Sequence, residues 1–442
     1  MKNKKTIYIE TYGCQMNFSD SEIVASILTE HGYLYSRDLQ EADIILINTC
    51  SIRENAEQKV RHRLQYFRSL KKKKPGLIIG LLGCMAERTK TALIEEENLL
   101  DLIAGPDSYR DLPNLLAKIG QGHPLVHTIL SQEETYADII PVRLDKNGVS
   151  GFISIMRGCE NFCSYCVVPS TRGQERSRDA NSILRETQDL FNKGYREVTL
   201  LGQNVNSYRW SENGIFITFA ELLARVASLD HLLRIRFATS HPKDFSDELL
   251  LTIAQNSNIC KAIHLPIQSG SNKVLDRMNR KYTRDQYLER ITAIRHYIPE
   301  CAISTDIITG FCGETEEDHQ QTLSLMENVG FDFAYMFKYS ERKMTLAAET
   351  LKDDVPDPIK ERRLREVIQL QQELSLKSNK LDVGKIFEVL IEGESKKSNN
   401  YFSGRNSQNK VVVFPKAKTG VNHYVNVKIL RCTSATLMGE VL

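Results

Sequence analysis

Short apolar runs alternate with amphipathic segments along the first part of the chain. The amphipathic segments include Ser21–His31 and Arg53–Leu70, in which apolar side chains recur with helical spacing. Strands that alternate with helices predict a parallel sheet covered by helices on both faces. We therefore predict a Rossmann-like α/β domain over residues 1–121. The runs that we expect to form its strands are Thr6–Ile9, Ile44–Ile47, Leu77–Leu82 and Leu102–Ala104.

The same alternation continues at greater length over residues 145–375, after a polar segment, 122–144, that we predict to be a linker. About six strand–helix units fit an open or partial (β/α) barrel, in which functional residues gather on the loops after the strands. The expected strands are Phe152–Met156, Glu197–Leu201, Arg234–Ala238, Ala262–Leu265, Ala302–Ile307 and Phe333–Phe337. The expected helices are Asn181–Asn192, Phe219–Ser228, Arg284–His296, Glu316–Asn328 and Ile359–Asn379.

The pattern changes again over residues 378–442, where short β-rich runs are separated by glycines. Such runs predict a small β-barrel. This segment has ten Lys or Arg against five Asp or Glu, whereas the whole chain carries a net charge of only +2. A basic module of this kind fits RNA binding, although a well-solvated barrel surface explains the charge equally well. The candidate phosphate contacts are Lys396, Lys397, Arg405, Lys410, Lys416 and Lys418.

The bulk composition is that of a soluble protein, with 41% hydrophobic and 26% charged residues. No run approaches the roughly 20 apolar residues of a membrane span, and the start of the sequence lacks the apolar core of a secretion signal. We therefore expect a cytoplasmic protein with no membrane partner. Disulfides are rare in the cytosol, so clustered cysteines there indicate metal or redox chemistry.

Three of the ten cysteines, Cys159, Cys163 and Cys166, lie in one polar loop directly after the first expected strand of the barrel. Three thiolates so close together can hold a [4Fe–4S] cluster and leave one iron open. The amino and carboxylate groups of S-adenosylmethionine (SAM) are the obvious ligand for that iron. The alternative is zinc, but structural zinc sites usually take four protein ligands, and no fourth Cys or His follows in the loop.

A second trio is dispersed in sequence, but Cys14, Cys50 and Cys84 each follow the end of an expected strand. The carboxyl ends of parallel strands share one edge of a sheet, so these thiols are expected to converge. Three ligands would again leave one iron open, here for an exogenous sulfur atom. The alternative is three small buried cysteines. The remaining cysteines, which we expect to be structural, are Cys260, Cys301, Cys312 and Cys432.

Small or amide-bearing residues recur at the ends of the expected barrel strands. Each set alone could form an ordinary turn, but their recurrence at one rim favours a site for a nucleotide-like cofactor. The residues that we expect to contact SAM are Gln203, Ser240, Gln268 and Asp306.

Seven segments resemble the methylthiotransferase family of radical-SAM enzymes, and the resemblance extends over essentially the whole chain. The details around Cys14 and Cys50 are most similar to the branch that acts on isopentenyladenosine in tRNA. The segments are Thr11–Asn17, Asn48–Ala56, Gly83–Glu87, Gly158–Pro169 with Thr171–Gly173, Leu201–Tyr208, His264–Ser271 and Met278–Tyr282.

The resemblance implies an N-terminal methylthiotransferase domain, a radical-SAM domain and a C-terminal TRAM domain that binds RNA. It implies two [4Fe–4S] clusters and two SAM molecules, which together place a methylthio group on carbon 2 of an isopentenylated adenosine next to the anticodon. No catalytic residue beyond the cluster ligands is expected. The implied partners are the tRNA anticodon stem-loop, an electron donor and a sulfur source, and the chain is expected to be a monomer.

Two other readings of the chemistry stay open. Related methylthiotransferases act on threonylcarbamoyladenosine in tRNA or on a ribosomal-protein aspartate, and these would share the architecture. A non-enzymatic RNA-binding zinc protein is the alternative from another class.

Overall fold

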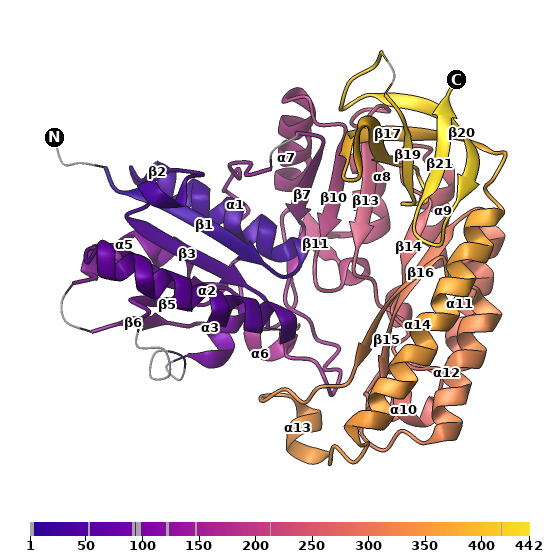
Figure 1. Cartoon of the computed structure of the whole chain (residues 1–442), viewed down its shortest axis with the longest axis horizontal. Coiled ribbons are helices and arrows are strands. Elements are labelled where there is room, and N and C mark those ends of the chain that lie inside the picture. Colours follow the sequence, from indigo (N-terminus) through magenta and orange to yellow (C-terminus); the bar gives the residue numbers. More distant parts are fainter. Residues whose placement is uncertain are drawn as a thin grey trace. The chain divides into compact units, whose positions relative to one another are not determined.

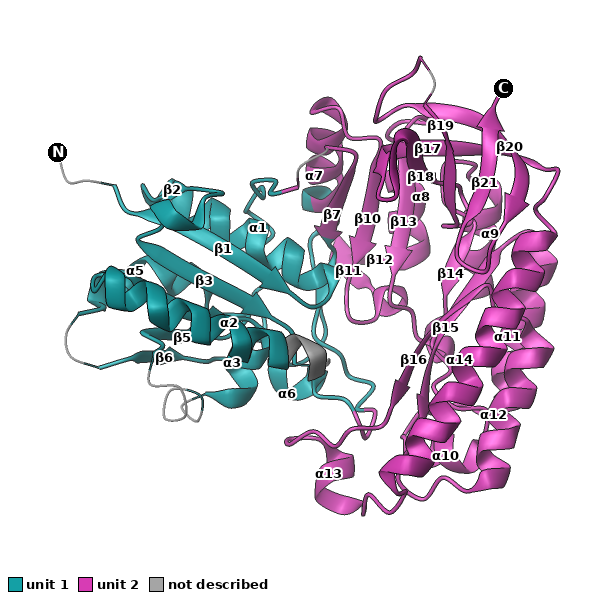
Figure 2. Cartoon of the chain, viewed as in Figure 1, with its two compact units in different colours: residues 1–144, 154–162, 166–182 teal, residues 145–153, 163–165, 183–442 magenta. Residues whose placement is uncertain are grey.

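A computed structural model describes residues 4–51, 54–90, 93, 99–120, 123–145, 148–212, 214–416 and 418–442. The motif residues Ile52 and Arg53 lie outside this range. The chain forms two compact units, which Figure 2 distinguishes by colour. Unit 1 comprises residues 1–144, 154–162 and 166–182, and unit 2 comprises residues 145–153, 163–165 and 183–442.

A six-stranded parallel sheet forms the centre of unit 1, with the strand order β2-β1-β3-β4-β5-β6. Its strands are β1 (Thr6–Tyr12), β2 (Leu34–Tyr35), β3 (Ile44–Thr49), β4 (Ile78–Leu82), β5 (Leu102–Ala104) and β6 (Leu125–His127). The first, third, fourth and fifth coincide with the apolar runs of the sequence. The sixth lies within the segment that the sequence predicts as a linker.

Helices cover both faces of this sheet, because alternate side chains of each strand point to opposite faces. Ile44 and Leu46 pack with α1 (Gln15–Glu30) and α5 (Leu112–Lys118). Ile45 and Ile47 pack in a second core with α2 (Glu54–Lys73) and α3 (Cys84–Thr89). The N-terminal part is therefore the doubly covered α/β layer that the pattern predicts.

Unit 1 also contains the segments on either side of the cysteine loop, with the short antiparallel pair β8 (Met156–Arg157) and β9 (Arg176–Ser177) and the helix α6 (Val168–Arg172). Tyr136, in the predicted linker, is buried and stacks on Tyr109. The linker segment therefore packs against the N-terminal core.

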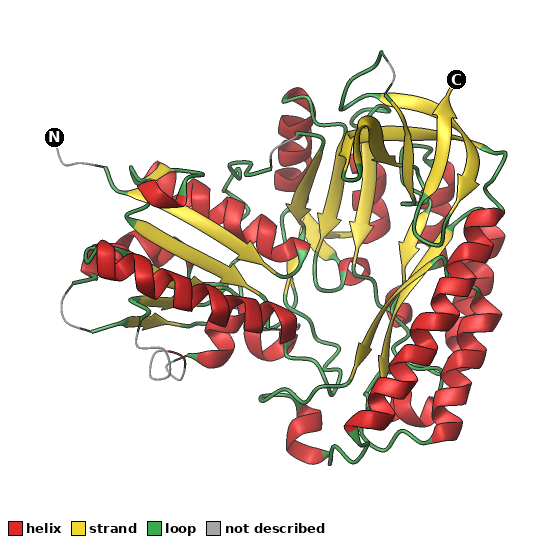
Figure 3. Cartoon of the chain, in the orientation of Figure 1, coloured by secondary structure: helices red, strands yellow, loops and turns green. Residues whose placement is uncertain are grey.

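Unit 2 contains two three-stranded groups, β13-β10-β7 and β14-β15-β16. A parallel bridge between Ile235 and Ile259 joins the segments at β13 and β14. Figure 3 shows the strands in yellow beside the helices that cover them. The strands are β7 (Ser150–Ser154), β10 (Glu197–Leu201), β13 (Arg234–Ala238), β14 (Ala262–His264), β15 (Ala302–Thr309) and β16 (Phe333–Lys338). These correspond to the strands expected from the sequence.

Helices α11, α12 and α14 run along one side of β14, β15 and β16 (Figure 1). Several helices begin with a side-chain cap, such as Thr283 at α11 and Thr315 at α12, each with a capping box. The helices are α7 (Ala180–Asn192), α8 (Phe219–Ala227), α9 (Asp247–Gln255), α10 (Asn272–Arg277), α11 (Arg284–Tyr297), α12 (Glu316–Val329), α13 (Leu346–Thr350) and α14 (Asp357–Lys380). A hairpin of β11 (Arg209–Glu212) and β12 (Ile215–Thr218) follows β10.

A closed five-stranded barrel completes the chain, with the order β17-β18-β19-β21-β20. Its core includes Val389, Val412, Phe414 and Val427. The strands are β17 (Ile386–Ser395), β18 (Ser398–Arg405), β19 (Val411–Pro415), β20 (Tyr424–Cys432) and β21 (Leu437–Val441). The three-part α/β fold class predicted from the sequence is confirmed. None of the described helices has the length and apolar character that crossing a membrane requires.

Candidate metal centres

The ends of three adjacent strands bring the dispersed cysteines of unit 1 together. Tyr12 at the end of β1 pairs with Thr49 of β3, and Leu82 at the end of β4 pairs with Asn48. Cys14 and Cys50 hydrogen-bond through their side chains, which lowers the pKa of Cys14 to about 6 against the opposing effect of burial. Burial raises the pKa of Cys84, which also interacts electrostatically with Cys14. These contacts match the convergence that the sequence predicts.

Two glycines allow this approach. Gly13 and Gly83 both have positive φ, at +115° and +86°. A Cβ on Gly13 would lie 2.4 Å from Cβ of Cys50, and one on Gly83 would lie 2.3 Å from Oδ1 of Asn48. Because side chains at these positions would overlap their neighbours, the strand ends can meet only with glycine there.

We expect Gly83→Ala to remove about half of the bound iron, because the added methyl would push Asn48 and the Cys50 segment away from Cys84. Gly32→Ala is the matched control, since Gly32 has nearly the same φ, +87°, but no atom within 4 Å of an added Cβ. Both variants place a side chain at a positive φ, a conformation that L residues rarely adopt. Iron analysis after anaerobic reconstitution would contradict this account if the two variants bound equal amounts.

Two asparagines form a polar shell behind the thiols. Oδ1 of Asn17 accepts a hydrogen bond from Sγ of Cys14 at 3.2 Å. Its Nδ2 donates to Oδ1 of Asn48 at 3.1 Å, and Nδ2 of Asn48 donates to the carbonyl of Asn17 at 3.0 Å. Both asparagines are fully buried. The pair therefore fixes the start of α1 against the end of β3, where Cys14 and Cys50 lie.

A buried ionic group lies next to the same thiols. Asp20 of α1 accepts from Nη2 of Arg157 at 2.5 Å and from Nη2 of Arg172 at 2.7 Å. Burial raises the pKa of Asp20, but the charges of the two arginines outweigh it and the net shift is downward. Nε of Arg172 also donates to Sγ of Cys84 at 3.2 Å.

The second cysteine loop is divided between the units: Cys159 and Cys166 belong to unit 1, and Cys163 belongs to unit 2. In unit 1, the backbone N–H of Cys159 donates to the carbonyl of Gly173 at 3.1 Å. Gly158, with φ of +79°, permits this contact, since a Cβ there would lie 1.8 Å from the carbonyl oxygen of Gln174. The backbone N–H of Val168 lies 3.5 Å from Sγ of Cys166.

In unit 2, Cys163 is held by a buried arginine. Nη1 of Arg280 donates to Sγ of Cys163 at 3.2 Å, and its Nη2 donates to the carbonyl of Pro266 at 2.7 Å. The neighbouring Ser164 donates from its backbone N–H to the carbonyl of Met278 at 3.0 Å. The segment from Met278 to Tyr282, which the sequence marks as a motif, thus supports the loop.

The loops after β10 and β13 contain buried polar atoms that have no hydrogen-bonding partner among the described residues. These atoms are Oδ1 of Asn204, Oγ of Ser240 and Nε2 of His241. Burial and the nearby charge of Arg280 lower the pKa of His241 to about 2, so its imidazole is neutral. Asn206 clamps the two loops by exchanging hydrogen bonds with the backbone of His241 at 2.8 and 2.9 Å.

The remaining candidates for SAM contacts lie after β10, after β14 and within β15. Gln268 has a φ of +74°, and its backbone exchanges hydrogen bonds with Asp306 and Ile308 at 2.9 Å. Oδ1 of Asp306 lies 3.5 Å from Nε2 of His264. Gln203 follows β10 and is partly buried. Contact of Gln203, Ser240, Gln268 and Asp306 with SAM stays a prediction.

The basic residues of the C-terminal barrel differ in their surroundings. Lys396, Lys397 and Lys418 are exposed. Lys416 is exposed but forms an ion pair with Glu394. Arg405 pairs with Glu392 at 3.3 Å. Lys410 is 13% exposed and its Nζ lies 2.7 Å from Asp382 and 3.2 Å from Asp332. RNA binding by these six residues stays a prediction.

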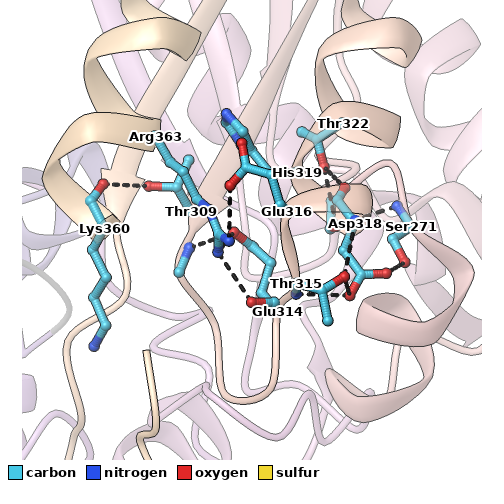
Figure 4. Close-up of polar contacts among 12 residues, drawn as sticks. Ser271, Thr309, Glu314, Thr315, Glu316, Asp318, His319, Thr322, Lys360 and Arg363 are labelled. Atoms are coloured by element: carbon cyan, nitrogen blue, oxygen red, sulfur yellow. Dashed lines mark hydrogen bonds and ion pairs between the residues drawn. The ribbon is translucent and has the colours of Figure 1, made fainter. Parts of the chain in front are cut away.

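A group of acidic side chains around His319, shown in part in Figure 4, also has the spacing of a metal site. Its carboxylates are already paired, because Arg362 binds Glu316 at 2.6 Å and Glu366 at 2.8 Å. His319 is 2.7 Å from Glu366. Figure 4 also shows the neighbouring contact of Arg363 with Glu314, at 2.9 Å. We interpret this group as an ion-pair network that holds α12 against α14.

Sequence reasoning assigned no role to Asp20, Asn17, Asn48, Arg172 or Arg280. Four of these lie inside the motifs quoted above, which was the available signal, and Asn17 and Asn48 also lie within three residues of a cysteine. Asp20 lies outside those motifs, and its partner Arg172 is 152 residues away.

Models of known families match most of the chain. Residues 6–105 match the uncharacterized protein family UPF0004, residues 153–326 match the radical SAM superfamily, and residues 380–442 match the TRAM domain.

Curated relatives match nearly the full length. A tRNA-2-methylthio-N(6)-dimethylallyladenosine synthase of Amoebophilus asiaticus is 57% identical over 99% of this chain and 92% of its own. The enzyme of the same name from Parabacteroides distasonis is 58% identical over 99% of this chain and 96% of its own. A third, from Chloroherpeton thalassium, is 56% identical with the same coverage.

Solved structures share the fold at low sequence identity. The radical S-adenosylmethionine methyltransferase TsrM from Kitasatospora setae, with cobalamin and a [4Fe–4S] cluster bound, gives a TM-score of 0.57 at 14% identity over 76% of this chain and 75% of its own. The cobalamin-dependent radical enzyme OxsB gives 0.56 at 15% identity over 84% of this chain and 56% of its own.

Proposed function

Because this chain belongs to the family of tRNA-2-methylthio-N(6)-dimethylallyladenosine synthases, we propose that its two cysteine trios hold two [4Fe–4S] clusters and that it methylthiolates N6-dimethylallyladenosine in tRNA. Cys14, Cys50 and Cys84 hold one cluster, and Cys159, Cys163 and Cys166 hold the other. The observation that carries the proposal is the meeting of Cys14, Cys50 and Cys84 at three strand ends, where Cys14 hydrogen-bonds to Cys50 and interacts electrostatically with Cys84.

The residues present fit these groups. Clusters of this kind are held by thiolates, and hydrogen bonds to the sulfurs tune them. In each trio one thiol sulfur accepts a hydrogen bond from a buried guanidinium group. Arg172 donates to Cys84 and Arg280 donates to Cys163, both at 3.2 Å. The orphaned polar atoms of Asn204, Ser240 and His241 favour a polar ligand at the ends of β10 and β13. The two clusters and SAM, when bound, supply the electron, the radical and the methylthio sulfur.

The chain's own residues orient these groups. A C–H bond at carbon 2 of adenine is neither acidic nor electrophilic, so a side-chain acid or base would not suffice for its substitution. Cofactors carry such chemistry, while the protein binds them, orients them and excludes water. Burial is the main cause of the low pKa of His241, and it keeps the ring neutral. Oδ1 of Asn204 and Oγ of Ser240 are the other buried atoms here without a partner among the described residues. We therefore assign no catalytic acid or base.

The C-terminal barrel is the proposed contact with the tRNA backbone. Exposed lysines bind phosphates through their charge. An adenine base that reacts inside a protein must first unstack from the neighbouring bases of the RNA. Lys396, Lys397 and Lys418 are exposed and have no ion pair among the described residues, and Lys416, directly after β19, is exposed but paired with Glu394. Lys410 is committed to Asp332 and Asp382 and contributes to the barrel's attachment instead.

Replacing Lys396, Lys397 and Lys418 together with Gln is expected to weaken tRNA binding and to reduce the slope of log K against log salt by about one for each phosphate that the lysines no longer neutralise. Lys193→Gln is the control, because Lys193 is exposed directly after α7, outside the barrel, and its ion pair with Asp189 is of the weak, exposed kind. Filter binding over a series of salt concentrations measures both the affinity for tRNA and this slope. An unchanged slope in the triple variant would remove the barrel lysines from the interface.

Anaerobic reconstitution followed by assay on dimethylallylated tRNA tests the proposed function. Nucleoside mass spectrometry should find the 2-methylthio derivative only when the tRNA carries the dimethylallyl group. Modification of threonylcarbamoyladenosine tRNA, or of a ribosomal-protein aspartate, in its place would contradict the proposed substrate. Stoichiometric zinc without sulfide would contradict the chemistry.

The proposal extends to partners and location. An electron donor and a sulfur source are required by the chemistry, the tRNA contact is made through the anticodon stem-loop, and we propose a monomer that works in the cytoplasm.

A further inference from the structure

A buried cation reaches the thiols of unit 1 from a segment far along the chain. Arg172 is the last residue of α6, and its Nε lies 3.2 Å from Sγ of Cys84. Its side chain is 3% exposed, so water does not screen the contact. The same guanidinium also acts on Cys14, whose thiol feels its charge. Arg172 therefore donates a hydrogen bond to one member of the trio and interacts electrostatically with a second.

The charges around Arg172 do not balance within the described residues that contact it. Asp20 offers one carboxylate to two guanidinium groups, those of Arg157 and Arg172, and all three side chains are at most 3% exposed. Buried charge is stable only when it is compensated. Nη1 of Arg172 also has no hydrogen-bonding partner among the described residues. The excess positive charge and the free donor both favour an anionic group beside Cys84.

We propose that Arg172 is a positioning residue that sets the reduction potential of the cluster on Cys14, Cys50 and Cys84, an inference that rests on the ligand set proposed above. A cluster with three thiolates carries net negative charge, and reduction adds one more negative charge. Hydrogen bonds to ligand sulfur and a nearby cation stabilise the more negative state, so they raise the potential. Asp20 fixes the guanidinium in place through its second carboxylate oxygen.

The redox change in question is a single electron transfer. Dithionite donates one electron to the cluster and is itself oxidised, while the cluster core goes from the 2+ to the 1+ state. No bond to Cys84 breaks and no proton needs to move. Arg172 affects only the free energy of this step, through the N–H to sulfur contact and its charge.

The test is a reductive titration of the full chain carrying Cys163→Ala, which leaves the N-terminal cluster as the source of the signal. The parent is compared with versions that also carry Arg172→Met or Arg172→Lys, and electron paramagnetic resonance measures the reduced fraction at each potential. Arg172→Met is expected to lower the reduced fraction about tenfold at fixed potential, a shift of about 59 mV to more negative values. Arg172→Lys keeps the charge and should shift less.

Arg280→Lys in the same parent is the control, since Arg280 belongs to unit 2 and its guanidinium contacts Cys163. It should leave the potential unchanged. A wild-type potential in a loaded Arg172→Met chain would overturn the inference. If the Arg172→Met chain does not incorporate the cluster, the Arg172→Lys chain provides the test. A lowered reduction potential in that chain supports the inference, and an unchanged potential overturns it. A parent without any cluster signal would instead overturn the proposed ligand set itself.

Discussion

The Cys163→Ala variant is expected to lose SAM cleavage and methylthiolation entirely while keeping about half of its iron. The two remaining thiolates of its loop cannot hold a cubane that leaves only one iron open. Arg280, whose Nη1 lies 3.2 Å from Sγ of Cys163, would also face a methyl group in place of sulfur. Iron and sulfide analysis, with a chromatographic assay for SAM cleavage, measures both effects.

Cys432→Ala is the matched control, since Cys432 lies in β20 of the C-terminal barrel, away from both trios in sequence. It should keep full iron and full activity. Substantial SAM cleavage by the Cys163→Ala chain would contradict the assignment of this loop. Complete loss of iron would mean that the clusters do not load independently.

Replacing Asp20 with Asn is expected to lower the free energy of unfolding by about 3–5 kcal/mol, as breaking a buried ion pair does. The substitution leaves Arg157 and Arg172 without their carboxylate, at 1% and 3% side-chain exposure. Both guanidinium groups stay charged, so the folded state must carry two buried cations that have lost the carboxylate they share. Denaturant unfolding under anaerobic conditions measures the difference.

The pH dependence of the free energy of unfolding provides a second test with the same variant. The pKa of Asp20 lies below its usual value of about 3.9 in the folded state. Its contribution is therefore present above the unfolded pKa and is lost as the pH falls through the folded pKa. The difference in the free energy of unfolding between wild type and Asp20→Asn should be constant near neutral pH and shrink below about pH 4. A gap that persists in acid would contradict an ionic origin.

Asp189→Asn is the control for this prediction. Asp189 of α7 pairs with Lys193, four residues on and just after the end of the helix, and the lysine is 52% exposed. Exposed pairs of this kind contribute about 0.3–0.5 kcal/mol. A loss from Asp189→Asn as large as that from Asp20→Asn would show that the measurement does not separate buried from exposed charge.

Periodicity alone predicts much of the fold, because most strands of the main sheets lie on short apolar runs and several helices carry an apolar stripe. The run Ile44–Ile47 supplies both cores of the N-terminal sheet, and a strand buried on both faces has just this unbroken apolar sequence. The trio of Cys14, Cys50 and Cys84 follows from the same logic, since parallel strands end at one edge. Glycine at positions 13 and 83 was a visible signal of close approach there.

Polar contacts between residues far apart in sequence cannot be predicted from the periodicity of apolar residues. The ion pair between Asp20 and Arg172 joins residues 152 apart, and a charge in an amphipathic helix usually faces solvent. The partner of Arg280 is likewise 117 residues away. Lys410 belongs to a basic segment, yet its ammonium is paired with Asp332 and Asp382. Charge counts cannot separate such a structural lysine from an exposed one, because only the fold decides which carboxylates lie nearby.

Iron and sulfide content of the anaerobically reconstituted full chain tests the central claim most directly, when it is measured for the wild type, Cys50→Ala, Cys163→Ala and the double variant. Two independent three-cysteine clusters predict about eight iron and eight sulfide per chain in the wild type, about four in each single variant and none in the double variant. A wild type with about four of each, lost equally in both single variants, would contradict it.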